Sequence, residues 1–505
     1  MTFVSFAYAL LLPVVFLLCR LAAPRSARGQ NIVLLAASYI FYGWWDWRFL
    51  GLLALVTFVT YGCALPATHR RRWTALAVTV DLGVLFVFKY LGFFAENLGW
   101  LFANFGWELD WFTVEILLPV GISFYVFQAV GYSVDVCRGE IPPERDPLTF
   151  ALFVSFFPQL VAGPIERAGA LLPQFHKPRG FDYAGAVEGS RRILWGLFKK
   201  VVVADGVARW VQHAFIGTAP SGMELAVGAC LFSVQIYADF SGYSDIAVGS
   251  ARLLGVRLTD NFLFPFFSRN GAELWRRWHV SLMEWFRQYV YIPMGGSRRG
   301  NVYVYLLVVF LLSGLWHGAA WTFVAWGLLN GLWVAFDRAV KVPVYRPAAG
   351  PAVTRADIPD CIFTFWLFTW TFIFFRADSL PQALAFVRDC ASGMLQLLGG
   401  ALVLGWTVRR WRRAPLWLAV AAVGVVVAAF AYRPADTFDS VLFHLPWIAA
   451  AAMFVAEWYV RGRGTFGLAC VPRRGWLRAT LYLALAFLVF TGAIHAGSSF
   501  IYFRF

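Results

Sequence analysis

Residues 302–336 read VYVYLLVVFLLSGLWHGAAWTFVAWGLLNGLWVAF, and this stretch decides the fold class. Two apolar runs, from Val302 to Leu312 and from Ala319 to Phe336, flank a short segment that carries a histidine, His317. A transmembrane helix needs about 20 predominantly apolar residues. Runs of this kind therefore predict helices that cross or enter a lipid bilayer.

The composition extends this prediction to the whole chain. Of 505 residues, 60% are hydrophobic and 14% are charged, whereas soluble domains carry roughly 25% charged residues. This balance excludes a soluble globular protein of this size, and it also excludes disordered, collagen-like and disulfide-framework chains. The seven cysteines form no Cys-x-x-Cys pair, so they indicate neither a disulfide framework nor a zinc site.

The membrane also explains the basic excess. Lys and Arg number 43 against 28 Asp and Glu, a net charge of +15. Arg clusters fall between apolar runs, as the positive-inside rule requires of cytoplasmic loops, and no nucleic-acid partner is expected. We predict that loops 20–28, 69–72, 409–413 and 461–478 are cytoplasmic and that residues 44–48 and 96–110 face outward.

We expect one integral-membrane domain over residues 1–505 with about 11–13 spans. We divide it into N-terminal spans (1–147), a core that contains His279 and His317 (148–336) and C-terminal spans (337–505). From 148 to 300 the apolar runs are short and interrupted by prolines and charges, which predicts irregular backbone around a cavity. The predicted spans are 3–19, 32–42, 50–65, 73–91, 111–134, 302–312, 319–336, 358–375, 416–432, 443–460 and 481–494.

Ionisable side chains within apolar runs mark candidate sites, because each costs several kcal/mol inside a bilayer. Asp81 and Lys89 share one predicted span, eight positions apart. The alternative interpretation is a structural partnership or a lysine that reaches the membrane interface.

Residues 235–245 hold a denser polar group. Asp239 and Asp245 could act as an acid and base pair, and Ser241 and Tyr243 add hydroxyls. The Ser-Gly-Tyr-Ser sequence also predicts a helix break whose side chains satisfy freed backbone groups. On chemistry alone, the structural interpretation is favoured.

Two of the seven histidines stand in unusual contexts. His317 lies beside Gly318 between apolar runs, and His279 ends the sequence Trp-Arg-Arg-Trp-His. A neutral imidazole can take a proton from a hydroxyl near neutral pH, and a glycine leaves room for a substrate. Acyl transfer needs such a base, whereas packing within the bundle is the alternative for His317. The His-x-x-x-His spacing of zinc sites is absent, so no metal is expected.

Further motifs follow one another along most of the chain. They are 118–125 (LPVGISFY) with Gln128, 157–165 (FPQLVAGPI), Tyr237 with 239–245 (DFSGYSD), Asn261-Phe with Pro265, 275–279 (WRRWH) leading to 291–296 (YIPMGG), 315–318 (LWHG) and 500–505 (FIYFRF). In this order they resemble the membrane-bound O-acyltransferase (MBOAT) family, and within it the bacterial alginate O-acetyltransferase branch.

The resemblance implies an all-α polytopic membrane fold, with short and re-entrant helices around a central tunnel. It implies that His317 is essential, as general base on the acceptor hydroxyl or as relay of the acyl group. His279 would orient the acceptor or the donor carbonyl. Arg276 and Arg277 are candidates to hold the donor phosphates, with interfacial anchoring as the alternative. The expected tunnel residues are Trp278, Trp316, Asp239, Ser241, Tyr243, Asp245 and Asn261.

The implied reaction moves an acetyl group from a cytoplasmic donor, acetyl-CoA, to a hydroxyl reached through the tunnel, with no permanently bound cofactor. Periplasmic or extracytoplasmic partner proteins would complete delivery to an exported polysaccharide, alginate or a similar glycan, and the chain would lie in a bacterial inner membrane. Two alternatives stay open: acyl transfer of another kind, such as D-alanyl transfer to a surface polymer, and a glycan or lipid-carrier transporter without chemistry. A scaffold is a third, but no large soluble domain supports it.

Overall fold

The computed structural model describes residues 1–21, 25–107, 117–217, 220–343, 353–410, 437–461, 468 and 475–495. These residues form helices, and no β-strand occurs among them, which confirms the predicted all-α class. The α-helices are α1 (Phe6–Leu21), α2 (Ala27–Gly43), α3 (Phe49–Ala64), α4 (Arg70–Leu85), α5 (Leu91–Asn104), α6 (Ile122–Arg138), α7 (Pro147–Ser155), α8 (Phe157–Leu160), α9 (Ala168–Phe175), α10 (Tyr183–Leu197), α11 (Asp205–Ile216), α12 (Gly222–Leu253), α13 (Gly271–Arg277), α14 (Val280–Phe286), α15 (Val302–His317), α16 (Trp321–Ala339), α17 (Ile358–Arg376), α18 (Leu380–Arg410), α20 (Thr437–Val460) and α21 (Gly475–His495). The π-helical segments are η1 (Phe86–Tyr90), η2 (Phe198–Ala204) and η4 (Arg287–Tyr291), and the 3-10 segments are η3 (Pro265–Phe267) and η5 (Arg355–Asp357).

The chain is a multi-pass membrane protein. Within the described residues, five helical segments are long and apolar enough to cross a bilayer: 70–104, 222–253, 355–376, 380–406 and 475–493. Shorter apolar helices cover 6–21, 49–64, 147–160, 302–317 and 445–460. Most predicted spans coincide with helices to within a few residues. The predicted span 416–432 and the start of the predicted span 111–134 lie outside the described residues.

Two long helices were not predicted. Helix α18 has 31 residues, and no span was expected there. Helix α12 runs unbroken for 32 residues, so the predicted helix break at Ser-Gly-Tyr-Ser is wrong. The reason is packing: a Cβ at Gly242 would lie 2.7 Å from the carbonyl oxygen of Gly196 in α10. Gly242 therefore allows two helix backbones to approach closely, as small residues do in membrane helices.

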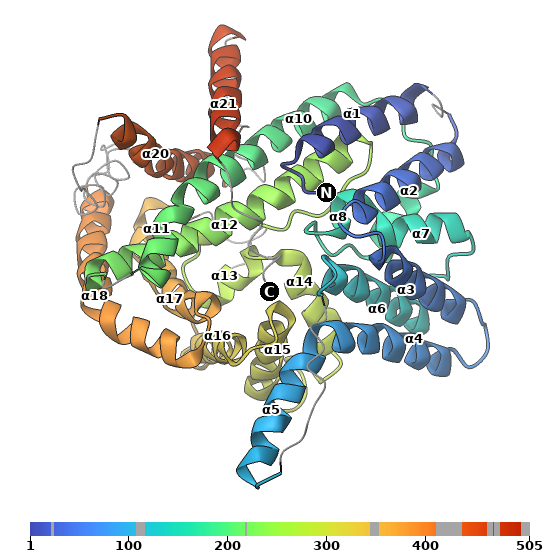
Figure 1. Cartoon of the computed structure of the whole chain (residues 1–505), viewed down its shortest axis with the longest axis horizontal. Helices are drawn as coiled ribbons and strands as arrows, with labels where there is room; N and C mark the ends of the chain where they lie inside the picture. The colour runs from blue at the N-terminus through green and yellow to red at the C-terminus, as the bar shows by residue number, and fades with distance from the viewer. Residues whose placement is uncertain are drawn as a thin grey trace. The chain divides into compact units, whose positions relative to one another are not determined.

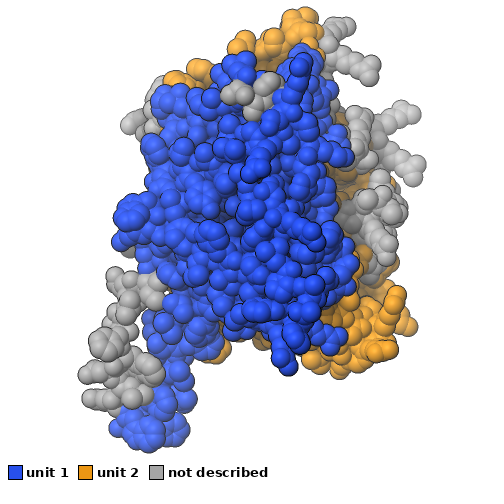
Figure 2. Space-filling view, turned by 90° about the vertical axis from the view of Figure 1, so that its right-hand side faces the viewer, with its two compact units in different colours: residues 1–190, 247–259, 316–320 blue, residues 191–246, 260–315, 321–505 orange. Residues whose placement is uncertain are grey.

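The chain divides into two units (Figure 2). Unit 1 holds residues 1–190, 247–259 and 316–320, and unit 2 holds 191–246, 260–315 and 321–505. Within unit 1, α2 packs against α1 and α7, and α3, α4 and α6 pack against one another (Figure 1). Within unit 2, α17 packs against α16 and α18, and η2 packs against α11, α20 and α21. The single domain with three regions stays a prediction from the sequence.

Helices α15 and α16 form a tight hairpin in unit 2. Helix α15 begins after Asn301, whose side-chain oxygen accepts a hydrogen bond from the backbone N–H of Tyr303 at 3.0 Å. The next helix approaches so closely that neither Gly314 nor Gly327 has room for a Cβ. This packing fixes the course of α15 within unit 2.

Candidate active site

His317 is the last residue of α15 and belongs to unit 1. It is 4% exposed, and Trp316 is 3% exposed. The two rings meet edge to face with centroids 4.9 Å apart. The Trp316 indole also contacts Phe124 and Phe127 of α6, at centroid distances of 5.3 and 5.9 Å. His317 is thus a buried histidine at a helix end, beside an aromatic cluster that fixes its neighbour.

Asp81 and Lys89, which the sequence places in one span, have separate partners. Asp81 accepts a hydrogen bond from the hydroxyl of Thr60 at 2.9 Å. The ammonium of Lys89 lies 2.6 Å from the carbonyl oxygen of Trp316 and 3.1 Å from that of His317. The two charged residues therefore do not form an ion pair, and Lys89 contacts the backbone that carries the candidate base.

His279 precedes α14 in unit 2. The short helices α13 and α14 have seven residues each and lie outside the segments that could cross a membrane. His279 has a φ of 46°, in the left-handed region, which is costly for a residue with a side chain and clusters at functional sites. It is 1% exposed, and its ring packs edge to face on Phe240 with centroids 4.7 Å apart. Burial lowers the pKa of His279 to about 3, so the ring is neutral at physiological pH.

The hydrogen bonds of Asn261 fix the tautomer of this ring. The side-chain oxygen of Asn261 lies 3.0 Å from Nδ1 of His279, and it also accepts from the N–H and the hydroxyl of Ser281 at 3.3 and 3.0 Å. The amide nitrogen of Asn261 donates to Ser244 at 3.4 Å, which supports this amide orientation. An amide oxygen only accepts, so Nδ1 of His279 carries the proton and Nε2 carries the lone pair.

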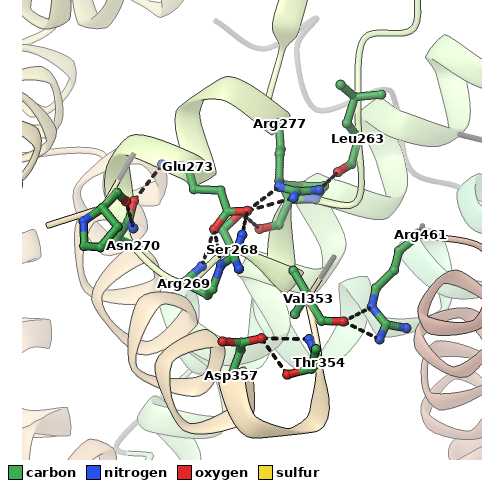
Figure 3. Close-up of polar contacts among 12 residues, drawn as sticks. Leu263, Ser268, Arg269, Asn270, Glu273, Arg277, Val353, Thr354, Asp357 and Arg461 are labelled. Atoms are coloured by element: carbon green, nitrogen blue, oxygen red, sulfur yellow. Dashed lines mark hydrogen bonds and ion pairs between the residues drawn. The ribbon is translucent and has the colours of Figure 1, made fainter. Parts of the chain in front are cut away.

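The two candidate donor-phosphate residues, Arg276 and Arg277, differ in environment. Arg277 is buried and pairs with Glu273 at 2.7 Å, and it donates to the carbonyl of Leu263 at 3.1 Å (Figure 3). Arg269 pairs with the same carboxylate at 3.0 Å. Burial alone would raise the pKa of Glu273, but hydrogen bonds from Arg269 and the charge of Arg277 outweigh it and lower that pKa. Arg276 is exposed, so it is the better placed of the two for a ligand.

The polar group on α12 forms buried ion pairs with η2 and the end of α10. Asp239 pairs with Lys200 at 2.7 Å, and each side chain is 1% exposed. Asp245 pairs with Lys199 at 2.5 Å and with Arg192 at 2.9 Å. The π-helical turn contains both lysines, and such turns occur as bulges within longer helices. Because the two carboxylates pair with different lysines, these contacts favour a structural role over an acid and base pair. That role is ion pairing between helices and not the predicted helix break.

All seven predicted tunnel residues are buried: Trp278, Trp316, Asp239, Ser241, Tyr243, Asp245 and Asn261. They divide between the two units, Trp316 in unit 1 and the others in unit 2. The tunnel itself stays a prediction. Within the described residues, no group of three or more His, Cys, Asp or Glu could hold a metal ion.

Sequence reasoning missed several buried carboxylates, and the one in a predicted span is Glu457. Glu457 of α20 is 2% exposed, and it accepts hydrogen bonds from the Tyr237 hydroxyl at 2.8 and 2.9 Å. The signal was present, because Glu457 is a lone acid in the apolar run 443–460, and ionisable residues in such runs mark candidate sites.

Comparison with known proteins identifies the family. Residues 39–376 match the model of the membrane-bound O-acyltransferase family. The chain belongs to the MBOAT family. A probable alginate O-acetylase of Azotobacter vinelandii is 42% identical over 367 residues, which cover 71% of this chain and 72% of that protein. A peptidoglycan O-acetyltransferase of Helicobacter pylori is 34% identical over 404 residues, covering 73% and 74%. A teichoic acid D-alanyltransferase of Streptococcus thermophilus is 25% identical over 329 residues, covering 58% and 79%.

Membership of the MBOAT family makes this chain a membrane-bound O-acyltransferase, as the motifs predicted. The matched range includes His279 and His317 and ends with the last residue of α17.

Proposed function

We propose that this MBOAT chain transfers an acetyl group from cytoplasmic acetyl-CoA to a hydroxyl, for O-acetylation of an exported polysaccharide, alginate or a similar glycan. It works in a bacterial inner membrane with extracytoplasmic partner proteins that complete delivery, and it holds no permanent cofactor. The similarity to O-acetyltransferases of surface glycans supports this acceptor class. D-alanyl transfer to a surface polymer is the second candidate, supported by the similarity to a teichoic acid D-alanyltransferase.

In the proposed reaction, His317 takes the proton of the acceptor hydroxyl while the hydroxyl oxygen attacks the thioester carbonyl. The bond from the carbonyl carbon to sulfur breaks, an ester forms, and His317 returns the proton to the leaving thiolate. Alignment of the two reactants and exclusion of water supply the rest of the acceleration. Of the two arginines, the exposed Arg276 is the stronger candidate for contact with the donor phosphates.

The observation that carries an enzymatic function is the hydrogen bond between His279 Nδ1 and the Asn261 side-chain oxygen. A ring protonated on Nδ1 can accept a hydrogen bond at Nε2 but cannot donate one there. It can therefore orient a hydroxyl, which donates, and it cannot polarise a carbonyl, which only accepts. This favours contact of His279 with the acceptor over contact with the donor. A transporter needs a polar lining but no ring held in one tautomer.

Replacement of each histidine by alanine tests the proposal. We expect His317→Ala to abolish acetylation of the exported glycan at normal membrane abundance, since general acid–base groups contribute about 100- to 10,000-fold. His279→Ala should also lose most transfer. His213→Ala is the matched control, because His213 lies exposed on α11. Unchanged acetylation in His317→Ala would remove that residue from the mechanism.

A second experiment tests the donor and its side. Radiolabelled acetyl-CoA supplied to inside-out vesicles should label the acceptor or a partner protein. Labelling only from the opposite face would contradict the cytoplasmic donor. Labelling by an activated D-alanyl donor in place of acetyl-CoA would favour the second candidate function.

A further inference from the structure

The last two residues of α15, Trp316 and His317, belong to unit 1, and a lysine of the same unit contacts their carbonyl oxygens. Lys89 lies in η1, and its ammonium is 2.6 Å from the Trp316 carbonyl oxygen and 3.1 Å from the His317 carbonyl oxygen. The same ammonium lies 5.9 Å from the centroid of the Trp316 ring. One side chain therefore contacts both residues of the Trp-His sequence at the backbone.

These carbonyls need such a partner. The last four carbonyl groups of an α-helix have no intrahelical donor, and the helix does not continue into residues 318–320. An ammonium offers three N–H donors, and a cation at a helix C-terminus is stabilised by the helix dipole. In a membrane protein an unsatisfied backbone group is costly, because the hydrocarbon core offers no water to bond it. Lys89 thus satisfies groups that would otherwise weaken the helix end.

The contacts of Lys89 disfavour both an ion pair and an interfacial lysine. Within the described part of the chain, no carboxylate forms an ion pair with Lys89, and Asp81 of the same span is bonded to Thr60. A lysine that merely reached for the membrane interface would direct its ammonium to water, whereas this one is bonded to two backbone carbonyls. The π-helical turn that carries Lys89 also favours a functional role for this residue, because such turns occur frequently at functional sites.

We propose that Lys89 is a positioning residue for His317. By bonding the carbonyls of residues 316 and 317, it fixes the backbone from which the imidazole projects, while the aromatic contacts of Trp316 fix the neighbouring side chain. The inference rests on the proposed role of His317 as the base. If the inference is right, activity requires that residue 89 donate two hydrogen bonds to these carbonyls, and it does not require that Lys89 contact a substrate.

A series of substitutions at residue 89 tests this, with the purified native chain, acetyl-CoA as donor and release of free thiol with ester formation as readouts. Lys89→Met removes all donors and should lower kcat about 10- to 100-fold, since a displacement of about 1 Å can cost that much, with the KM for acetyl-CoA within about twofold. Lys89→Arg can donate to two carbonyls and should restore most of kcat. Lys89→Gln should lie between them. Lys341→Met is the control, because Lys341 is exposed after α16.

The outcomes distinguish the positioning role of Lys89 from the role of His317 on which it rests. If Lys89→Met keeps kcat within twofold, or raises KM at unchanged kcat, the positioning role is wrong. If Lys89→Met does not accumulate in the membrane, the comparison of Lys89→Arg with Lys89→Gln decides, and equal kcat values in these two would overturn the inference. His317→Ala is measured in parallel. Activity in that variant refutes the proposed role of His317 as the base, whereas an inactive His317→Ala beside a fully active Lys89→Met refutes only the role of Lys89. Absence of acetyl transfer by the native chain would refute the proposed function itself.

Discussion

Replacement of Asn261 by leucine tests whether the tautomer of His279 matters for transfer. Leucine has a similar size but accepts no hydrogen bond. Three buried donors lose their acceptor: Nδ1–H of His279, and the N–H and O–H of Ser281, now at 3.0, 3.3 and 3.0 Å from the Asn261 oxygen. The variant therefore removes the group that holds the proton on Nδ1 and leaves both histidines in place.

The contacts set the size of the effect. A buried donor left unsatisfied costs about 1–3 kcal/mol, so the free energy of unfolding should fall by about 3 kcal/mol or more. The hydrogen bond to Nδ1 has a net value of about 1–1.5 kcal/mol, which is roughly a five- to tenfold change in the ratio of the two tautomers. Transfer should slow by at least that factor, and by about 100-fold if the ring also loses its orientation.

Two further variants isolate the cause. Asn261→Asp keeps an acceptor for all three donors, but its negative charge favours the imidazolium and raises the pKa of His279 from about 3 toward neutrality. An imidazolium has no lone pair on Nε2, so this variant should lose activity as the pH falls through the raised pKa and regain it above. Ser281→Ala removes one hydroxyl and leaves the bond to His279, so its transfer rate should stay near that of the native chain.

The assay is acetyl transfer by purified protein between pH 5 and 9, with the unfolding temperature of each variant as a folding control. In the native chain, the pKa of His279 lies below this range, so titration of this ring should produce no loss on the acid side. The reasoning is refuted if Asn261→Leu, correctly folded, matches the native rate. An Asn261→Asp profile identical to the native profile would refute the pKa argument separately.

Three other predictions concern stability, measured as the unfolding temperature of the detergent-solubilised protein. Asp245→Asn leaves Lys199 buried without the carboxylate that lies 2.5 Å away, and it should cost about 3–5 kcal/mol; native stability would contradict the buried pair. Gly242→Ala places a methyl group 2.7 Å from the carbonyl of the facing helix and should cost about 1–3 kcal/mol; full stability would contradict the close approach of the two helices. Burial alone would raise the pKa of Glu273, but two neighbouring arginines lower it. The ionised Glu273 therefore stabilises the fold above its unfolded pKa of about 4.3, and this stabilisation is lost as the pH falls through the lower pKa of the folded state. Glu273→Gln should therefore flatten the acid dependence of the unfolding temperature, and an unchanged slope would count against this assignment.

The sequence predicted most of the fold because long apolar runs leave few alternatives in a bilayer. The prediction failed where one residue pattern is compatible with two local structures, and where only contact with a neighbouring helix decides between them. Gly242 is typical of a helix break in isolation and of close packing once Gly196 lies opposite. Helix α18 carries charges among its apolar residues, such as Arg388 and Asp389, which form an exposed ion pair, and these weakened its apolar pattern.

The sequence likewise predicted some residues of the candidate site but not the contacts between them. Motifs and burial rules pointed to His317 and His279, and Asn261 was expected as a tunnel residue. Its function as the acceptor for His279 depends on a contact between residues 18 positions apart, in a segment with no regular periodicity. Lys89 was recognised as unusual, but its partner lies 227 positions away. No local pattern could connect the two.

Both histidines lie where a helix stops, and this has a physical consequence. His279 immediately precedes α14, and His317 is the last residue of α15. Backbone groups at helix ends lack partners within the helix, and here side chains from elsewhere bond them. The Asn261 side-chain oxygen accepts from the N–H of Ser281, and Lys89 bonds the carbonyls of Trp316 and His317. A substitution in the middle of α15 changes packing but leaves its hydrogen bonds intact. Substitution of Asn261 removes a bond to the His279 ring, and substitution of Lys89 removes the bonds to the backbone that carries His317. These two positions should therefore be more sensitive in activity, relative to stability, than the exposed positions of α15.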